Sequence, residues 1–390
     1  MLQIEINNRL MGQAPLILLG IILFLVAGCS MGPKTLPGNR LDYNVSVQKS
    51  NNEELLINIV RARYVEPLFF LQVGSISSSF GYTANIGASA SFFHNFQNKF
   101  QIADVYTPSF GAGISETPTI TYSPLQGEKA VRQLQSELKL DRFLILTRTG
   151  WSIESLMWLT VIQMGELQNY SVGISGGDLY VNTYQKFLDL AHLLKAIQQR
   201  GDLEFVSLSK GDSGGDSLNM QLRYLDQGEA EKVETLLDIR PERIPLPGSR
   251  FLSKIELTSV RDFMPCNINK EKCSRVPVKL KSFFGMLVDL ALYVDIAADE
   301  QKKQIATPFK DLPGDLTFRR GLHAGLIRIK SSPENPTNAY AAIPYRNRWF
   351  YIADDDLSSK AYLMLVGSIY SLQSGDLQSA APLLTLPVGR

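Results

Sequence analysis

Residues 80–92 of this 390-residue chain, FGYTANIGASASF, alternate between apolar residues and Gly, Thr, Asn or Ser without interruption. Successive side chains of a β-strand point to opposite faces, so this two-residue period predicts a strand with one apolar and one polar face. The strand exceeds the roughly 9–11 residues that a tilted strand needs to cross a bilayer. Its apolar face consists of Phe80, Tyr82, Ala84, Ile86, Ala88, Ala90 and Phe92.

A second segment with a similar pattern, 108–122 (PSFGAGISETPTITY), is the predicted partner strand in an amphipathic hairpin over 80–122. Glu116 and Pro118 fall on its apolar face, where a carboxylate is unfavourable in lipid and a proline removes a donor from the ladder. Two interpretations stay open. The hairpin is a half-buried periplasmic or interface element, or it is a membrane hairpin that requires a ring of subunits.

The N-terminus predicts a lipoprotein leader. The apolar run from Ala14 to Val26 has the length of a signal-peptide core and is short for a membrane-spanning helix. It leads into Val26-Ala27-Gly28-Cys29, which resembles the lipobox of bacterial lipoproteins. The resemblance implies that residues 1–28 are removed and that Cys29 carries the lipid. It also implies the periplasmic face of the outer membrane, because Ser30 replaces the Asp that the class uses for inner-membrane retention.

The other two cysteines, Cys266 and Cys273, are close in the sequence. An oxidising periplasm favours a disulfide between them, and the lack of a neighbouring histidine makes them a poor zinc site. A net charge of +1 gives no basic field for nucleic acid. No cofactor or metal is expected.

The remaining patterns predict an α+β body that contains antiparallel hairpins and amphipathic helices. We expect a tether over 29–48, an N-terminal domain over 49–240 and a C-terminal domain over 251–390. The three prolines of 240–250 predict the linker between these domains. One helix is expected to start at the capping box Ser50-x-x-Glu53. Further helices are expected over 128–138, 153–164, 183–200, 282–296 and 357–374. Expected strands include 203–208, 218–224 and 251–257.

The segment Gly211-Asp212-Ser213-Gly214-Gly215 resembles the nucleophile segment of chymotrypsin-like proteases. Such an enzyme needs a histidine base in a defined context, and His94, His192 and His323 do not provide it. A hairpin loop explains the glycines better, and a serine hydrolase at Ser213 is the least favoured alternative. The three aspartates 354–356 favour a helix cap over a metal site.

Three blocks resemble a family of uncharacterised proteobacterial envelope lipoproteins: 55–76, 118–134, and 349–390 with its C-terminal LTLPVGR. The family has no assigned activity, so no functional residues follow from the resemblance. The favoured hypothesis is a non-enzymatic structural or interaction component of an envelope complex, with a secretion complex as one option. It would bind a protein partner or its own copies. The alternative is an oligomeric outer-membrane pore of shared hairpins. Candidate contact residues are Phe80, Tyr82, Ile86, Phe92, Tyr345 and Trp349.

Overall fold

The computed structural model describes residues 32–91, 105–125, 127–169, 178–207, 217–263, 273–303, 305–306, 327–375 and 384–387. The chain divides into two units, Met1–Glu53 and Glu54–Arg390. Helices combine with antiparallel and mixed sheets, so the predicted mixed α and β class is confirmed. No described helix is both long enough and apolar enough to span a membrane.

The first helix, α2 (Gly32–Arg63), begins well before the helix start predicted at Ser50 and covers most of the predicted tether. It begins at Gly32, so Ser50 and Glu53 lie inside it and do not cap its start. Pro33 is compatible with the first turn, because backbone N–H groups there have no partner within the helix. The helix ends where Val65 adopts a positive φ of 58° and Glu66 N donates to Arg61 O at 2.9 Å.

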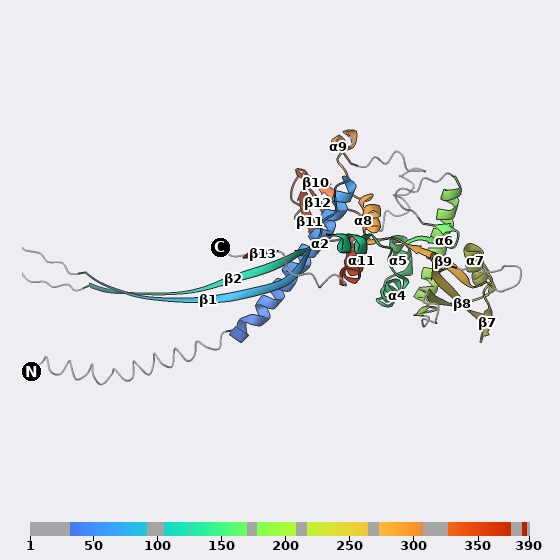
Figure 1. Cartoon of the computed structure of the whole chain (residues 1–390), viewed down its shortest axis with the longest axis horizontal. Coiled ribbons are helices and arrows are strands. Elements are labelled where there is room, and N and C mark those ends of the chain that lie inside the picture. Colours follow the sequence, from blue (N-terminus) through green and yellow to red (C-terminus); the bar gives the residue numbers. More distant parts are fainter. Residues whose placement is uncertain are drawn as a thin grey trace, which may run out of the picture. The chain divides into compact units, whose positions relative to one another are not determined.

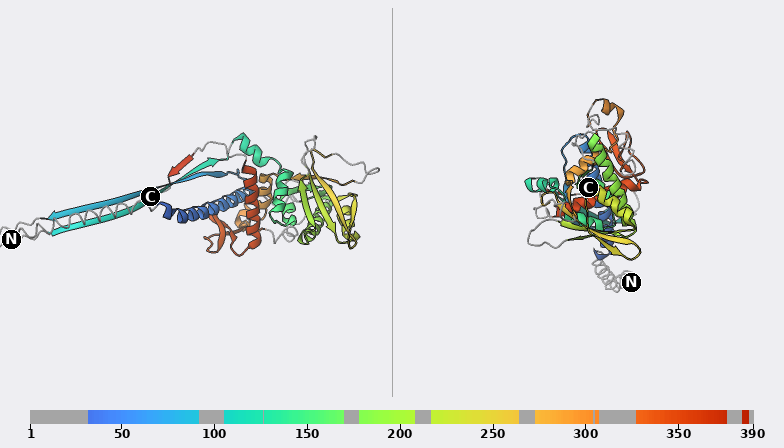
Figure 2. Two further views of the ribbon diagram at one scale, coloured as in Figure 1. Left: turned by 90° about the horizontal axis from the view of Figure 1, so that it is seen from below. Right: turned by 90° about the vertical axis from the view of Figure 1, so that its right-hand side faces the viewer.

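Three sheets are present among the described residues. The first joins β1 (Leu71–Ser91), β2 (Val105–Pro124) and β13 (Leu384–Pro387) in the order β1-β2-β13. The second has the order β10-β12-β11 and consists of β10 (Lys330–Ser332), β12 (Arg348–Ala353) and β11 (Ala339–Tyr345). Figures 1 and 2 show β1 and β2 lying side by side along their length.

The third sheet has seven strands in the order β4-β3-β9-β8-β6-β5, with β7 paired to β8. Only β8 and β9 run parallel. Alternate residues of β6 are buried, as its sequence predicts: Leu218, Met220, Leu222 and Tyr224. The strands are β3 (Val161–Met164), β4 (Leu167–Gln168), β5 (Leu203–Ser207), β6 (Ser217–Tyr224), β7 (Arg243–Leu246), β8 (Arg250–Ser259) and β9 (Arg275–Leu280).

This sheet differs from the predicted division into domains 49–240 and 251–390. Strands β6 and β8 pair from Ser217↔Thr258 to Tyr224↔Phe251, across the expected linker. Part of that linker is β7, which pairs with β8 alone. Pro245 fits there because an edge strand tolerates a missing N–H donor. Residues 54–390 therefore form one unit.

The helices mostly follow their expected signals. Helix α11 (Leu357–Ser374) has the predicted bounds, and Asp356 caps it by accepting a hydrogen bond from Ser359 N at 3.0 Å. Helix α5 ends at Thr160, earlier than predicted, and the chain continues as β3. The others are α3 (Glu128–Gln135), α4 (Leu140–Arg148), α5 (Ile153–Thr160), α6 (Asp178–Gln199), α7 (Gln227–Leu237), α8 (Phe283–Ala291) and α9 (Ala298–Lys302).

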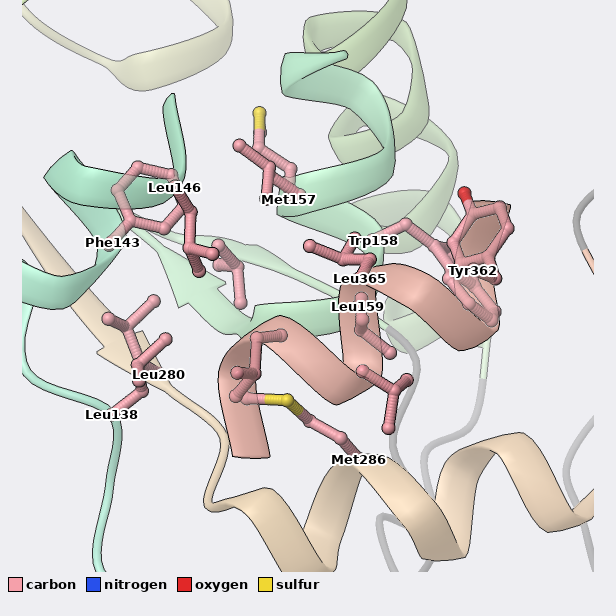
Figure 3. Close-up of a cluster of buried hydrophobic side chains, with 14 of the residues drawn as sticks. Leu138, Phe143, Leu146, Met157, Trp158, Leu159, Leu280, Met286, Tyr362 and Leu365 are labelled. Atoms are coloured by element: carbon pink, nitrogen blue, oxygen red, sulfur yellow. The ribbon is translucent and has the colours of Figure 1, made fainter. Parts of the chain in front are cut away.

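One hydrophobic core joins these elements, from Leu55 in α2 to Ile369 in α11. Figure 3 shows a part of it in which Trp158 of α5 and Tyr362 of α11 lie together, with ring centroids 5.5 Å apart. Met286 of α8 and Leu280 of β9 belong to the same core. Residues from both predicted domains thus share a single interior.

The core also contains an ion pair. Lys281 Nζ lies 2.7 Å from Asp289 Oδ2, and the two side chains are 4% and 5% exposed. Lys281 Nζ also donates to Trp158 O at 3.2 Å. The pair therefore connects the end of β9 with α8 and α5, and its Coulomb energy must offset the loss of hydration of both charges.

We expect Lys281→Met to lower the free energy of unfolding by about 3–5 kcal/mol, because it leaves the Asp289 carboxylate buried without its cation. The matched double variant Lys281→Met/Asp289→Leu removes both charges and should recover most of that loss. Urea unfolding of the full chain in detergent, followed by tryptophan fluorescence, measures both. Equal losses in the two variants would contradict this account.

Candidate interaction site: the hairpin of β1 and β2

The hairpin is a continuous antiparallel pair. Its register runs from Leu71↔Pro124 to Ser91↔Val105, with one irregularity between Val73 and Ser75. The predicted strand and its partner are confirmed, and β1 begins nine residues before the predicted start at Phe80. At a rise of about 3.3 Å per residue, the 21 residues of β1 span about 70 Å. Phe92, the last residue of the predicted strand, lies outside the described residues.

The register gives the hairpin two faces. Residues directly opposite in an antiparallel pair share a face. Tyr82 pairs with Ile114 and Ile86 with Phe110, so the even-numbered apolar positions of both strands fall on one face. The odd-numbered pairs from Gly81↔Ser115 to Ser89↔Thr107 are small or polar, and Ser91↔Val105 adds one valine. The alternation predicted from one strand therefore extends across both.

Glu116 and Pro118 lie toward the base of the hairpin. Glu116 pairs with Phe80 and Pro118 pairs with Ser78. From Tyr82↔Ile114 to Ser91↔Val105, the hairpin contains no charged residue in either strand. These ten rungs match the roughly 9–11 residues of a membrane-crossing strand. Glu116 thus lies outside these uncharged rungs.

The C-terminal strand β13 covers only the base of β2. Its pairing runs from Leu384↔Tyr122 to Pro387↔Thr119. Beyond Thr119, residues 105–118 of β2 pair with β1 on one side, and no described strand pairs with them on the other. The outer edge of β1 likewise has no described partner strand. The outer edge of β1 and the outer edge of β2 at residues 105–118 therefore have no partner strand among the described elements.

Helix α2 fixes the start of β1 through two side chains. Asn58 Nδ2 donates to Phe69 O and Asn58 Oδ1 accepts from Phe69 N, both at 2.8 Å. Glu54 Oε1 accepts from Leu71 N at 2.5 Å. Burial raises the pKa of Glu54 to about 7, although the hydrogen bond from Leu71 lowers it. A sequence signal exists for Asn58 alone, as a polar residue on the apolar face of its helix.

Phe70, which lies between the hydrogen-bonded residues Phe69 and Leu71, is buried among aromatic rings. Its ring centroid lies 4.9 Å from Tyr370, 5.7 Å from Phe283 and 6.3 Å from Phe284. On the other strand, Leu125 N donates to Phe70 O at 2.9 Å. The base of the hairpin is therefore held to the core by both backbone and side-chain contacts.

The other two candidate contact residues, Tyr345 and Trp349, lie in the β11–β12 hairpin. Arg346 and Asn347 have φ of 48° and 61°, which fits a two-residue type I′ turn. Tyr345 is half-buried and donates to Glu66, which also accepts from Arg346 at 2.7 Å. These two hydrogen bonds hold the pKa of Glu66 below its usual range. Tyr345 is thus engaged within the chain, and Trp349 is half-buried opposite Pro344.

Of Ser213 and the three histidines, only His192 lies within the described residues. Ser213 lies outside the described residues, and its flanking strands β5 and β6 pair antiparallel as the hairpin interpretation predicts. His192 Nδ1 lies 2.5 Å from Glu154 Oε1, and Lys195 Nζ lies 2.5 Å from the other oxygen of that carboxylate. His94 and His323 lie outside the described residues.

No cluster of three potential metal ligands occurs in the part of the chain that the structure describes. Asp354 accepts from Lys360 Nζ at 2.7 Å, and Asp356 caps α11, as expected. Cys29 and Cys266 lie outside the described residues, so lipidation and the Cys266–Cys273 bridge stay predictions. Comparison with known protein families, curated proteins and solved structures gives no match.

We expect Glu54→Gln to stabilise the chain at high pH. The pKa of Glu54 is about 7 in the folded state, so the carboxyl keeps its proton up to that pH, whereas the unfolded state loses the proton near the ordinary pKa of 4.5. Between these pH values the native state binds more protons, so its stability falls as pH rises. The variant should gain on the order of 2 kcal/mol over the wild type above pH 7 and nothing below pH 4, allowing for partial exposure.

Urea unfolding at several pH values measures this difference. Glutamine keeps the oxygen that accepts from Leu71 N, whereas the control Glu54→Ala removes it and should destabilise at every pH. A difference between wild type and Glu54→Gln that does not change with pH would contradict the assigned shift.

Proposed function

We propose that this chain is a lipid-anchored component of the bacterial outer envelope that acts by assembly rather than catalysis. Cys29 would carry the anchor, and the body would face the periplasm. The hairpin of β1 and β2 would be the element through which the chain joins a larger particle. The lipobox-like VAGC supports the anchor, and the paired strands support the assembly role.

The observation that carries the proposal is the long two-faced register of the hairpin. A two-stranded ribbon is marginally stable in water when nothing else covers it. Among the described strands, a third strand is added to β2 at residues 119–122 alone, by β13. From Phe80 outward the ribbon combines an apolar face with two open edges. Assembly would bury that face and satisfy the backbone groups of those edges.

A second candidate, an oligomeric pore of shared hairpins, is favoured by the ten uncharged rungs between Tyr82↔Ile114 and Ser91↔Val105. Their even-numbered face suits lipid. Their odd-numbered face of Gly, Ser, Thr and Asn, with Val105 at its far end, suits a water-filled lumen. One hairpin cannot enclose a lumen, so the pore is a special case of the assembly.

Shortening the hairpin should dissociate the particle. The variant replaces residues 78–118 by Asn-Gly, which joins Ser77 to Thr119 through a turn that two-residue hairpins prefer. It keeps the rungs that β13 covers. Light scattering of the detergent-extracted native particle, with the detergent subtracted, should give a multimer for the parent and one chain for the variant.

The control for this experiment is the thermal unfolding of both proteins, which should agree because the core lies elsewhere in the chain. A monomeric parent would refute assembly by this chain alone. A shortened variant that keeps the mass of the parent would assign assembly to another surface.

The pore predicts a difference between two neighbouring residues. Ile86→Lys places a charge on the apolar face and should prevent dye release from lipid vesicles, because a lipid-facing lysine near the midplane costs about 2–4 kcal/mol per copy. Asn85→Lys, on the opposite face, should keep dye release and shift ion selectivity toward anions. Equal behaviour of the two variants, or no release by the wild type, would leave a water-soluble assembly as the function.

A further inference from the structure

Within the assembly proposed above, we propose that the partner of the hairpin is a second copy of this chain. The open edge of β2 between Pro108 and Pro118 would pair antiparallel with the outer edge of β1 in the next copy. Each chain then offers one edge and accepts the other, which is a head-to-tail contact that can close into a ring. This inference names the contact on which the proposed function rests.

The first argument is that the edge of β2 already accepts a strand. From Leu384↔Tyr122 to Pro387↔Thr119, β13 adds to it in an antiparallel register. The same edge continues past Thr119 without a described partner. A strand of another copy would therefore extend an interface that exists in the chain. It would begin where β13 ends, so β13 limits how far the neighbour can slide toward the base.

The second argument is that the two edges carry little protection over the proposed contact, since Pro108 and Pro118 of β2 lie only at its two ends. Proteins commonly guard an open strand edge with charges, prolines or bulges. Strand β1 contains no charged residue and no proline, and its irregularity lies at Val73 and Ser75 near the base. Strand β2 contains a single charge, Glu116. Residues 109–117 of β2, between the two prolines, have every backbone N–H that a ladder needs.

The third argument concerns the faces. Strand β1 runs antiparallel to β2 within one chain. Across the proposed contact, β1 of the next copy would again run antiparallel to β2. A slip of one residue would move every apolar position of a strand to the polar face. The apolar face continues from copy to copy only if even-numbered residues of β2 meet even-numbered residues of the neighbouring β1. This parity is a specific signature of the proposed contact.

Cysteine crosslinking between two tagged chains tests the signature. One full-length chain carries Ser115→Cys in β2, and the other carries a single added cysteine at each position from 77 to 91 of β1 in turn. Both are produced together and oxidised in the native membrane. Disulfides form only between residues that lie directly opposite each other. Heterodimers should appear at odd-numbered positions around one register and be lost at even-numbered ones.

The matched control is Thr119→Cys, an odd-numbered residue of β2 that β13 covers at Pro387. It should give no heterodimer with the same β1 series. Crosslinks at both parities, or from Thr119→Cys as well as Ser115→Cys, would overturn the inference and indicate random aggregation. So would a multimer without crosslinks, which points to another protein's strand on this edge. A monomeric particle by light scattering would also overturn this inference, and it would leave assembly with a different protein as the proposed function.

Discussion

The antiparallel pairing of β1 with β2 is the constraint on which the two faces of the hairpin and its proposed role depend. Backbone N–H and C=O groups need hydrogen-bond partners, and along most of the hairpin no other described strand pairs with β1 or β2. The register from Leu71↔Pro124 to Ser91↔Val105 then decides which side chains share a face. A change of one residue in that register would abolish the separation of apolar and polar faces.

The base of the hairpin shows how this ribbon is tied to a globular core. Asn58 and Glu54 of α2 bind the backbone at Phe69 and Leu71, while Phe70 enters a cluster of rings. A buried carboxylate is an expensive way to hold one N–H group, because burial disfavours its charged form. The base is therefore held by a buried polar contact as well as by the packing of rings.

Local patterns in the sequence predicted what is local in the structure. The alternation in 80–92 and 218–224 predicted two-faced strands, and the aspartate before Leu357 predicted the start of α11. The errors have physical causes. Pro245 suggested a linker but fits an edge strand, and the apolar run 153–164 has no period that marks its change from helix to strand. The pairing of β13 has no local signal, because its partner lies far away in the sequence.

That distance gives β13 a consequence in time. Its partner residues 119–122 leave the ribosome and cross the inner membrane long before residues 384–387 do, if the chain is exported from its N-terminus. During that interval the hairpin can fold but its base lacks the third strand. Contacts between such distant segments also form late in folding. The base of the hairpin would thus be complete only in a full-length chain. A chain truncated before β13 would lack the third strand at residues 119–122.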